Sequence, residues 1–287
     1  MAANLTRPVL RYHGGKFRLA PWIIGYFPPH RVYTEAFGGA ASVLMRKPRS
    51  FAEIYNDRWG VVVNVFRVLR DPAMAEQLET ALRLTPFARD EFEAEWPTDA
   101  EEPVERARRA ILRSFAGFGS ASTNGNYSTG FRPKSNRSHT TPAHDWVNYP
   151  DHVRRFSERL AGVVIENRPA AQIIETHDSP DTLHYVDPPY PHETRNMRRG
   201  NASYEIEMTA KDHEQLAETL QSCAGMVVLS TYPNALYDRL YAGWRREETK
   251  ALADGARPRI EVLYLNAACS ERQVQRQLWP CSHKETK

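Results

Sequence analysis

Short apolar runs alternate with helix-like segments along most of the 287-residue chain, and one polar, basic stretch interrupts this alternation. The runs predict strands at 31–37, 50–55, 163–165, 183–186, 226–229 and 260–265. Between them, the segments 19–26, 61–69 and 211–222 repeat apolar residues at helical spacing. Strands that alternate with helices favour an α/β fold in which a mostly parallel sheet carries helices on both faces.

Composition excludes several classes of protein. Hydrophobic residues make up 41% of the chain and charged residues 25%, which is typical of a globular protein and not of a disordered or fibrous one. No segment approaches the ~18 unbroken apolar residues of a membrane span, and the first residues do not resemble a secretion signal. Cys223, Cys269 and Cys281 form no closed disulfide framework, and no histidine has the spacing of a metal site. We therefore expect a cytoplasmic protein without a bound metal or a membrane partner.

The interruption is predicted to be an inserted subdomain, residues 73–157, between two halves of the sheet, residues 1–72 and 158–287. The part from Arg106 to His144 contains no Asp or Glu. Its second half is rich in glycine, serine and threonine with interleaved aromatic residues, which is typical of a long loop. Basic residues without neighbouring acids favour contact with a polyanion, and a solvated face is the alternative. The net charge of +3 agrees in sign, but the pI of about 8.7 is below the value above ~9 that is typical of a dedicated nucleic-acid-binding domain.

A Gly-Gly turn follows the first predicted strand and opens a helix. Gly38 and Gly39 permit a positive φ and a close approach of the backbone to a ligand. Asp57 ends the second strand, where its carboxylate can accept hydrogen bonds from a ribose diol or cap the next helix. Lys16 follows another Gly-Gly pair and can either bind a carboxylate or phosphate or stay solvated. Because a full G-x-G-x-x-G is missing, a nicotinamide or flavin dinucleotide is disfavoured.

The tetrad Asp187-Pro188-Pro189-Tyr190 directly follows the apolar run 183–186. Two prolines cannot continue a central strand, so they predict a rigid turn at its carboxyl end. Such a turn brings the Asp187 carboxylate, the Pro188 carbonyl and the Tyr190 ring to one place. The two oxygens can accept both hydrogens of an exocyclic amine while the ring stacks on its base. A turn that merely ends a strand is the structural alternative.

The order of these motifs closely resembles DNA N6-adenine methyltransferases of the Dam type, the D12 class. The resemblance rests on Tyr12–Lys16, Glu35–Ala40, Tyr55–Asp57, the basic insert and Asp187–Tyr190. It implies a Rossmann-like methyltransferase sheet with S-adenosylmethionine as the cofactor. It also implies the α order of motifs, with a helical and loop-rich target-recognition subdomain in the insert. Within the family, the chain looks most like phage or prophage members. The implied partner is double-stranded DNA, and we expect a monomer.

The resemblance also implies roles for individual residues. The cofactor site would consist of Tyr12, Lys16, Phe37, Gly38, Gly39, Ala40, Asp57 and Asp187. The catalytic group would be Asp187, Pro188, Pro189 and Tyr190, with Asp187 accepting from the adenine amine and Tyr190 stacking on the base. Contacts to DNA are expected from Arg113, Arg132, Lys134, Arg137, Arg195, Arg198 and Arg199. One departure from the family concerns Asn167-Arg168-Pro169, which stands where many members place an Asp near the cofactor's adenine.

The expected reaction is methyl transfer from S-adenosylmethionine to N6 of an adenine that has been flipped out of the duplex. The rival targets are cytosine N4, adenine in RNA, and a protein glutamine. Cytosine-N4 enzymes usually carry Ser at the first tetrad position and glutamine enzymes Asn, so Asp187 favours adenine. A DNA-binding relic without catalysis is a further alternative, although Lys16, Asp57 and Tyr190 are intact. The motifs do not assign a recognition sequence or a partner restriction nuclease.

Overall fold

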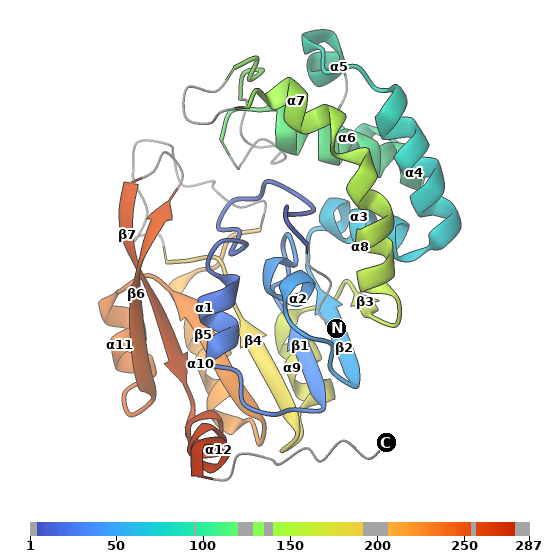
Figure 1. The fold of residues 1–287 in the computed structure, drawn as a ribbon. Helices are drawn as coiled ribbons and strands as arrows, with labels where there is room; N and C mark the ends of the chain where they lie inside the picture. The colour runs from blue at the N-terminus through green and yellow to red at the C-terminus, as the bar shows by residue number, and fades with distance from the viewer. Residues whose placement is uncertain are drawn as a thin grey trace.

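The computed structural model describes residues 5–94, 96–119, 129–134, 140–191, 206–253 and 257–278. A seven-stranded sheet crosses this part of the chain in the order β3-β2-β1-β4-β5-β7-β6, and helices lie on both of its faces (Figure 1). The mixed α/β class predicted from the alternation of strands and helices is therefore confirmed.

The strands are β1 (Val32–Glu35), β2 (Ala52–Asn56), β3 (Val164–Glu166), β4 (Thr182–Val186), β5 (Met226–Thr231), β6 (Arg245–Ala253) and β7 (Arg257–Leu265). Strands β1 to β5 pair in parallel, with Val32 of β1 opposite both Ala52 of β2 and Thr182 of β4. Strand β7 runs antiparallel to β5 and to β6. Strand β6 was not expected, because its first residues, Arg245–Lys250, are all charged or polar. They form a strand at the sheet edge, where their side chains reach water.

The sheet helices are α1 (Ala20–Gly25), α2 (Ser42–Arg46), α3 (Gly60–Arg70), α9 (Ala170–His177), α10 (Ala210–Ser222), α11 (Ala235–Leu240) and α12 (Ala267–Leu278). Side chains alternate across a strand, so neighbours in sequence enter different cores. Tyr33 and Tyr185 pack on the face of α1, α2 and α3, whereas Ile54 and Val186 pack on the face of α9, α10 and α11. The three helices predicted from apolar spacing are all present.

A helical subdomain lies between β2 and β3 in the sequence and comprises α4 (Pro72–Leu84), α5 (Arg89–Ala94), α6 (Pro103–Ala116), α7 (Pro142–Val147) and α8 (Val153–Leu160). Asp71 caps α4 and Glu102 caps α6 through hydrogen bonds to the first free backbone N–H groups. The apolar core of the subdomain is continuous with the core beneath α3 on one sheet face. The domain boundaries proposed from sequence remain a prediction, and the one at 157/158 falls inside α8.

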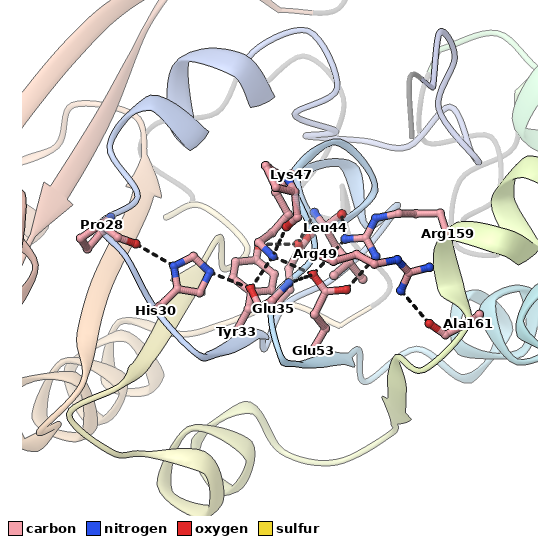
Figure 2. A network of polar contacts seen from close by, with 12 residues as sticks. Pro28, His30, Tyr33, Glu35, Leu44, Lys47, Arg49, Glu53, Arg159 and Ala161 are labelled. Atoms are coloured by element: carbon pink, nitrogen blue, oxygen red, sulfur yellow. Dashed lines mark hydrogen bonds and ion pairs between the residues drawn. The ribbon is translucent and has the colours of Figure 1, made fainter. Parts of the chain in front are cut away.

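A buried ionic network ties the last helix of this subdomain to the sheet (Figure 2). Arg159 of α8 donates from Nη1 to Glu53 Oε2 at 2.7 Å and from Nη2 to the Leu44 carbonyl at 2.5 Å. Lys47 Nζ donates to Glu53 Oε1 at 2.7 Å. Burial opposes ionisation of Glu53, but the hydrogen bonds from Arg159 and the charge of Lys47 outweigh it and lower the Glu53 pKa. Since each buried charge has a partner, the network holds α8 against β2 and α2.

None of the described helices has both the length and the apolar character required to cross a bilayer.

Candidate active site

A pocket opens where the carboxyl ends of β1, β2 and β4 meet. In an open α/β sheet this edge is where ligands bind, because the loops that follow adjacent strands converge there. The residues predicted to hold a cofactor all line it: Tyr12, Lys16, Phe37, Gly38, Gly39, Ala40, Asp57 and Asp187. Segments that are far apart in the sequence thus meet at one site. The particular role of each residue stays a prediction.

The Gly-Gly turn after β1 is closely packed. A Cβ on Gly38 would lie 2.2 Å from ring carbon Cε2 of Tyr55 and 2.9 Å from the Asn56 carbonyl oxygen. Gly39 has a φ of +46°, which disfavours any side chain there. The Gly38 N–H donates to the Asn56 carbonyl at 2.7 Å. Glycine at position 38 therefore lets this backbone pack against β2, whereas a Cβ on Gly39 would lie 2.9 Å from ring carbon Cε1 of Tyr12 in the pocket lining.

Asp57 joins the end of β2 to the glycine turn. Its Oδ2 accepts from the Gly39 N–H and its Oδ1 from the Trp59 N–H, each at 2.8 Å. Burial raises the Asp57 pKa, although these backbone hydrogen bonds oppose the rise. Asp57 therefore binds the backbone two residues further on, at Trp59, which is the N-cap residue of α3; no described side chain caps that helix, so the capping alternative is not met. Each carboxylate oxygen can accept a further hydrogen bond, so a ribose contact is compatible with this geometry.

The pocket contains features that suit a ligand with both polar and apolar parts. The Ser42 hydroxyl is buried in the lining and has no hydrogen-bond partner among the described residues. The rings of Tyr12 and Trp59 line the pocket with centroids 6.3 Å apart. At the departure from the family pattern, Asn167 Nδ2 donates to the Asp57 carbonyl at 2.7 Å. Asn167 thus connects the loop after β3 to the end of β2.

Lys16 and Asp187 form a buried ion pair at the floor of the pocket. Lys16 Nζ lies 2.9 Å from Asp187 Oδ2 and also donates to the Gly14 carbonyl at 2.9 Å. Only 5% of Lys16 is exposed, so the solvated-lysine alternative is wrong. Burial raises the Asp187 pKa to about 6, although the Lys16 ammonium acts to lower it. Asp187 is therefore a carboxylate at neutral pH and points toward the ligand space.

Tyr190 completes the tetrad but lies deeper than expected. Its hydroxyl donates to Glu261 Oε1 at 2.5 Å, and the Ser230 hydroxyl donates to the same oxygen at 2.7 Å. Lys16 Nζ lies 4.7 Å from the Tyr190 ring centroid, and Tyr232 meets that ring edge-on at 4.6 Å. Of the tetrad, Asp187 and Pro189 line the pocket.

Sequence reasoning missed Glu261, Glu35 and Ser230. A signal existed for Glu261, because it is an acidic residue at an inward position of the β-rich run Ile260–Leu265. Glu35 lines the pocket, where its Oε2 accepts from the Tyr33 hydroxyl and the Leu44 N–H, each at 2.7 Å. Burial raises the Glu35 pKa to about 8.

The predicted DNA-contacting arginines fall into different environments. Arg113 is only 4% exposed: its guanidinium lies 3.4 Å from the Trp96 ring centroid and donates to the Phe92 carbonyl. Arg113 therefore stabilises the helical subdomain from inside, and the expectation that it contacts DNA is withdrawn. Arg132 is half-buried and donates to the Phe115 carbonyl at 2.9 Å, whereas Lys134 is exposed. Arg137, Arg195, Arg198 and Arg199 lie outside the described residues.

The basic residues of α6 are paired with acidic residues more than the acid-free stretch of sequence suggests. Arg108 and Arg109 both pair with Glu105, at 2.5 and 2.7 Å, and Arg108 reaches Glu91 of α5 at 3.4 Å. These acids stand just before the acid-free stretch or on another helix. The helical spacing and the packing of α5 bring them to the arginines.

One group of residues with metal-binding atoms lies outside the pocket, although sequence spacing indicated none. Side-chain atoms of Asp178, His184 and Cys223 all lie within 4.8 Å of one another. Asp178 already accepts from the N–H groups of Ala224 and Gly225 and contacts His184 Nε2 at 3.2 Å. These contacts give the group a structural role between β4 and the ends of α9 and α10.

Comparison with known families agrees with the site. The model of a family described as D12 class N6 adenine-specific DNA methyltransferase matches residues 12–254. This span begins at Tyr12 and includes the glycine turn, the helical subdomain and the Asp187 tetrad. A search of curated proteins found no match. On the family match, the chain belongs to the D12 class of N6 adenine-specific DNA methyltransferases.

Proposed function

We propose that this protein transfers a methyl group from S-adenosylmethionine to the N6 amine of an adenine flipped out of duplex DNA. The observation that carries the proposal is the buried Lys16–Asp187 pair, which holds a carboxylate at the Pro-Pro turn in the lining of the pocket. Membership of the D12 class supports the reaction class and the DNA substrate.

The described pocket fits this cofactor. When bound, the cofactor would supply a methyl group on a sulfonium, whose sulfur would leave as a neutral thioether that needs no protonation, while the N6 amine would lose one proton to solvent. Asp57 would accept hydrogen bonds from the ribose diol, since both of its oxygens lie at the glycine turn. The Ser42 hydroxyl would bind a polar group of the methionine part, because it has no partner within the described chain. Gly38 and Gly39 both line this pocket, and the close packing of Gly38 on Tyr55 holds the turn in place.

The chain's part in the transfer is to bind and orient the target amine. The Asp187 carboxylate and the Pro188 carbonyl each accept one N6 hydrogen, which draws the amine away from planarity and frees its lone pair. Most of the rate enhancement then comes from positioning and electrostatics. Tyr190 is 3% exposed, with Tyr232 edge-on to its ring and Lys16 over it, so stacking of a base on this ring requires neighbouring groups to move.

The helical subdomain offers a surface for DNA. Gly117 and Phe131 form an antiparallel bridge, and the Phe118 N–H donates to the Gly130 carbonyl at 3.0 Å. Beside this bridge, Phe118 is 53% exposed and Lys134 is also exposed. An exposed aromatic ring and a cation on a fixed backbone suit contact with bases and phosphates.

The test is expression in a bacterial host that lacks adenine methylation, followed by single-molecule sequencing of its DNA. Wild type should produce N6-methyladenine and Asp187→Ala should not. Asp181→Ala is the matched control, since this exposed residue precedes β4 at its opposite end and its carboxylate pairs with Arg272 at 3.0 Å. N4-methylcytosine would instead show a cytosine enzyme. Cofactor binding without DNA methylation would indicate that the target amine belongs to RNA or protein.

A further inference from the structure

Glu261 is a buried carboxylate of β7 that neither the tetrad nor the glycine turn explains. One oxygen, Oε1, accepts from the Tyr190 hydroxyl at 2.5 Å and from the Ser230 hydroxyl at 2.7 Å, and lies 3.5 Å from Lys16 Nζ. Only 2% of the residue is exposed. Burying a carboxylate is unfavourable in free energy unless the group is paired or hydrogen-bonded. Here its partners are the functional residues themselves.

The Lys16 ammonium is shared between two carboxylates. It lies 2.9 Å from Asp187 Oδ2 and 3.5 Å from Glu261 Oε1. One cation cannot neutralise two anions, so Lys16, Asp187 and Glu261 together carry a net negative charge when both acids are ionised. Arg259 of β7 is a further cation in this region, with its guanidinium 5.9 Å from the centroid of the Tyr232 ring. If Glu261 were neutral, Lys16 would serve Asp187 alone. Asp187 would then present less negative charge, so it would accept a hydrogen bond from an amine less strongly and attract a cation less strongly.

We propose that Glu261 is a positioning residue for methyl transfer. It holds the Tyr190 hydroxyl in place and shares the Lys16 ammonium with Asp187. Because Lys16 neutralises Asp187 only in part, the Asp187 carboxylate keeps negative charge that acts on the cofactor and on the target amine. This inference rests on the proposed function. Glu261 does not touch the reacting atoms, and it acts through Tyr190, Lys16 and Asp187. The negative charge that it preserves favours the cationic cofactor over its neutral product.

The first test is ligand binding, which requires no turnover. Glu261→Gln keeps an acceptor oxygen for Tyr190 and Ser230 but removes the charge. Calorimetry compares sinefungin, which carries an ammonium group where the cofactor has its methyl sulfonium, with neutral S-adenosylhomocysteine. The preference for sinefungin should fall about fivefold in Glu261→Gln, because a nearby charge acts on a cation and not on a neutral ligand. Glu248→Gln, an exposed acid of the neighbouring strand β6, should leave the preference unchanged.

The second test is the pH profile of single-turnover methylation. Asp187 interacts electrostatically with Lys16, Glu35, Tyr185, Tyr190, Tyr232, Tyr237 and Glu261. The Glu261 charge raises the Asp187 pKa. In Glu261→Gln the acid limb of the profile, where the rate falls as Asp187 is protonated, should therefore lie about one pH unit lower. The plateau rate should fall about tenfold. A role limited to packing would lower the rate without moving this limb.

Glu261→Asp separates charge from reach and covers the case in which Glu261→Gln fails to fold. It keeps the negative charge but withdraws it from the Tyr190 hydroxyl, so the preference for sinefungin should persist while the rate falls. The proposal would be overturned if both variants lost affinity equally for sinefungin and for S-adenosylhomocysteine. It would also be overturned if neither variant changed its affinity for either ligand. A wild type that binds both ligands but methylates no DNA would refute the proposed function alone.

Discussion

Gly38 and the Tyr55 ring are packed so closely that the smallest side chain would not fit between them: a Cβ on Gly38 would lie 2.2 Å from Tyr55 Cε2. Gly38→Ala must therefore displace either β2 or the turn that lines the pocket. We expect a loss of about 2–3 kcal/mol in the free energy of unfolding and weaker cofactor binding. Urea denaturation and calorimetry measure the two effects.

Gly25→Ala is the matched control for that change. A Cβ at Gly25 in α1 meets nothing within 4 Å, so the variant should gain up to about 1 kcal/mol from helix propensity. Equal stability of the two variants would show that the turn tolerates a side chain.

Methylation should depend on the ionisation of Asp187. Burial raises the Asp187 pKa to about 6, and the carboxylate is the form that accepts the amine hydrogens. The rate should therefore rise with pH through about 6 and then level off. Lys16→Met removes the charge that opposes the rise, so the acid limb should move to higher pH as the cofactor affinity falls. Single-turnover rates between pH 5 and 9 measure this, with Lys250→Met, an exposed lysine of β6, as control.

Arg159 should contribute strongly to stability. Arg159→Met leaves Glu53 with Lys47 as its remaining cationic partner and removes the bond to the Leu44 carbonyl. We expect a loss of about 3–5 kcal/mol, as for other broken buried ion pairs. Arg154→Met on the same helix disrupts only an exposed pair with Glu158 and should change stability by less than about 1 kcal/mol. Similar losses in urea for both variants would contradict a special role for the buried network.

Glu35 should make stability depend on pH. Burial raises its pKa from 4.5 to about 8 in the folded protein, so folding promotes protonation of this carboxyl group. Its contribution to stability is complete below pH 4.5 and is lost as the pH rises through about 8. In Glu35→Gln this loss should be absent. Urea unfolding across that range measures the difference, and Glu175→Gln, an exposed acid of α9, is the control.

Lys134 and Arg113 should respond differently to substitution. Lys134→Ala should weaken DNA binding and lower the slope of affinity against salt by about 1, as expected for one phosphate contact. Arg113→Ala should instead reduce stability and leave that slope unchanged, because its guanidinium packs on Trp96 inside the subdomain. Fluorescence anisotropy over a salt series measures both. A slope that falls only in Arg113→Ala would reverse our assignment.

The sequence predicted most of the sheet because each buried strand has its own local signal. Apolar runs end at turn residues, and prolines 188 and 189 mark where β4 must stop. Strand β6 had no such signal: its charged residues gain a strand conformation only by pairing with β7. The motifs likewise predicted which residues would surround the pocket, since the carboxyl ends of parallel strands meet at one edge.

Only the tertiary structure decided which charges meet and which are buried. Spacing in sequence does not show that Lys16 reaches Asp187, or that Glu261 of β7 reaches the same ammonium. The acid-free stretch similarly predicted exposed cations, yet Arg113 is buried and Arg108 pairs with Glu105. The physical reason is that local patterns fix which element a residue joins, whereas the packing of distant elements fixes the environment of its side chain.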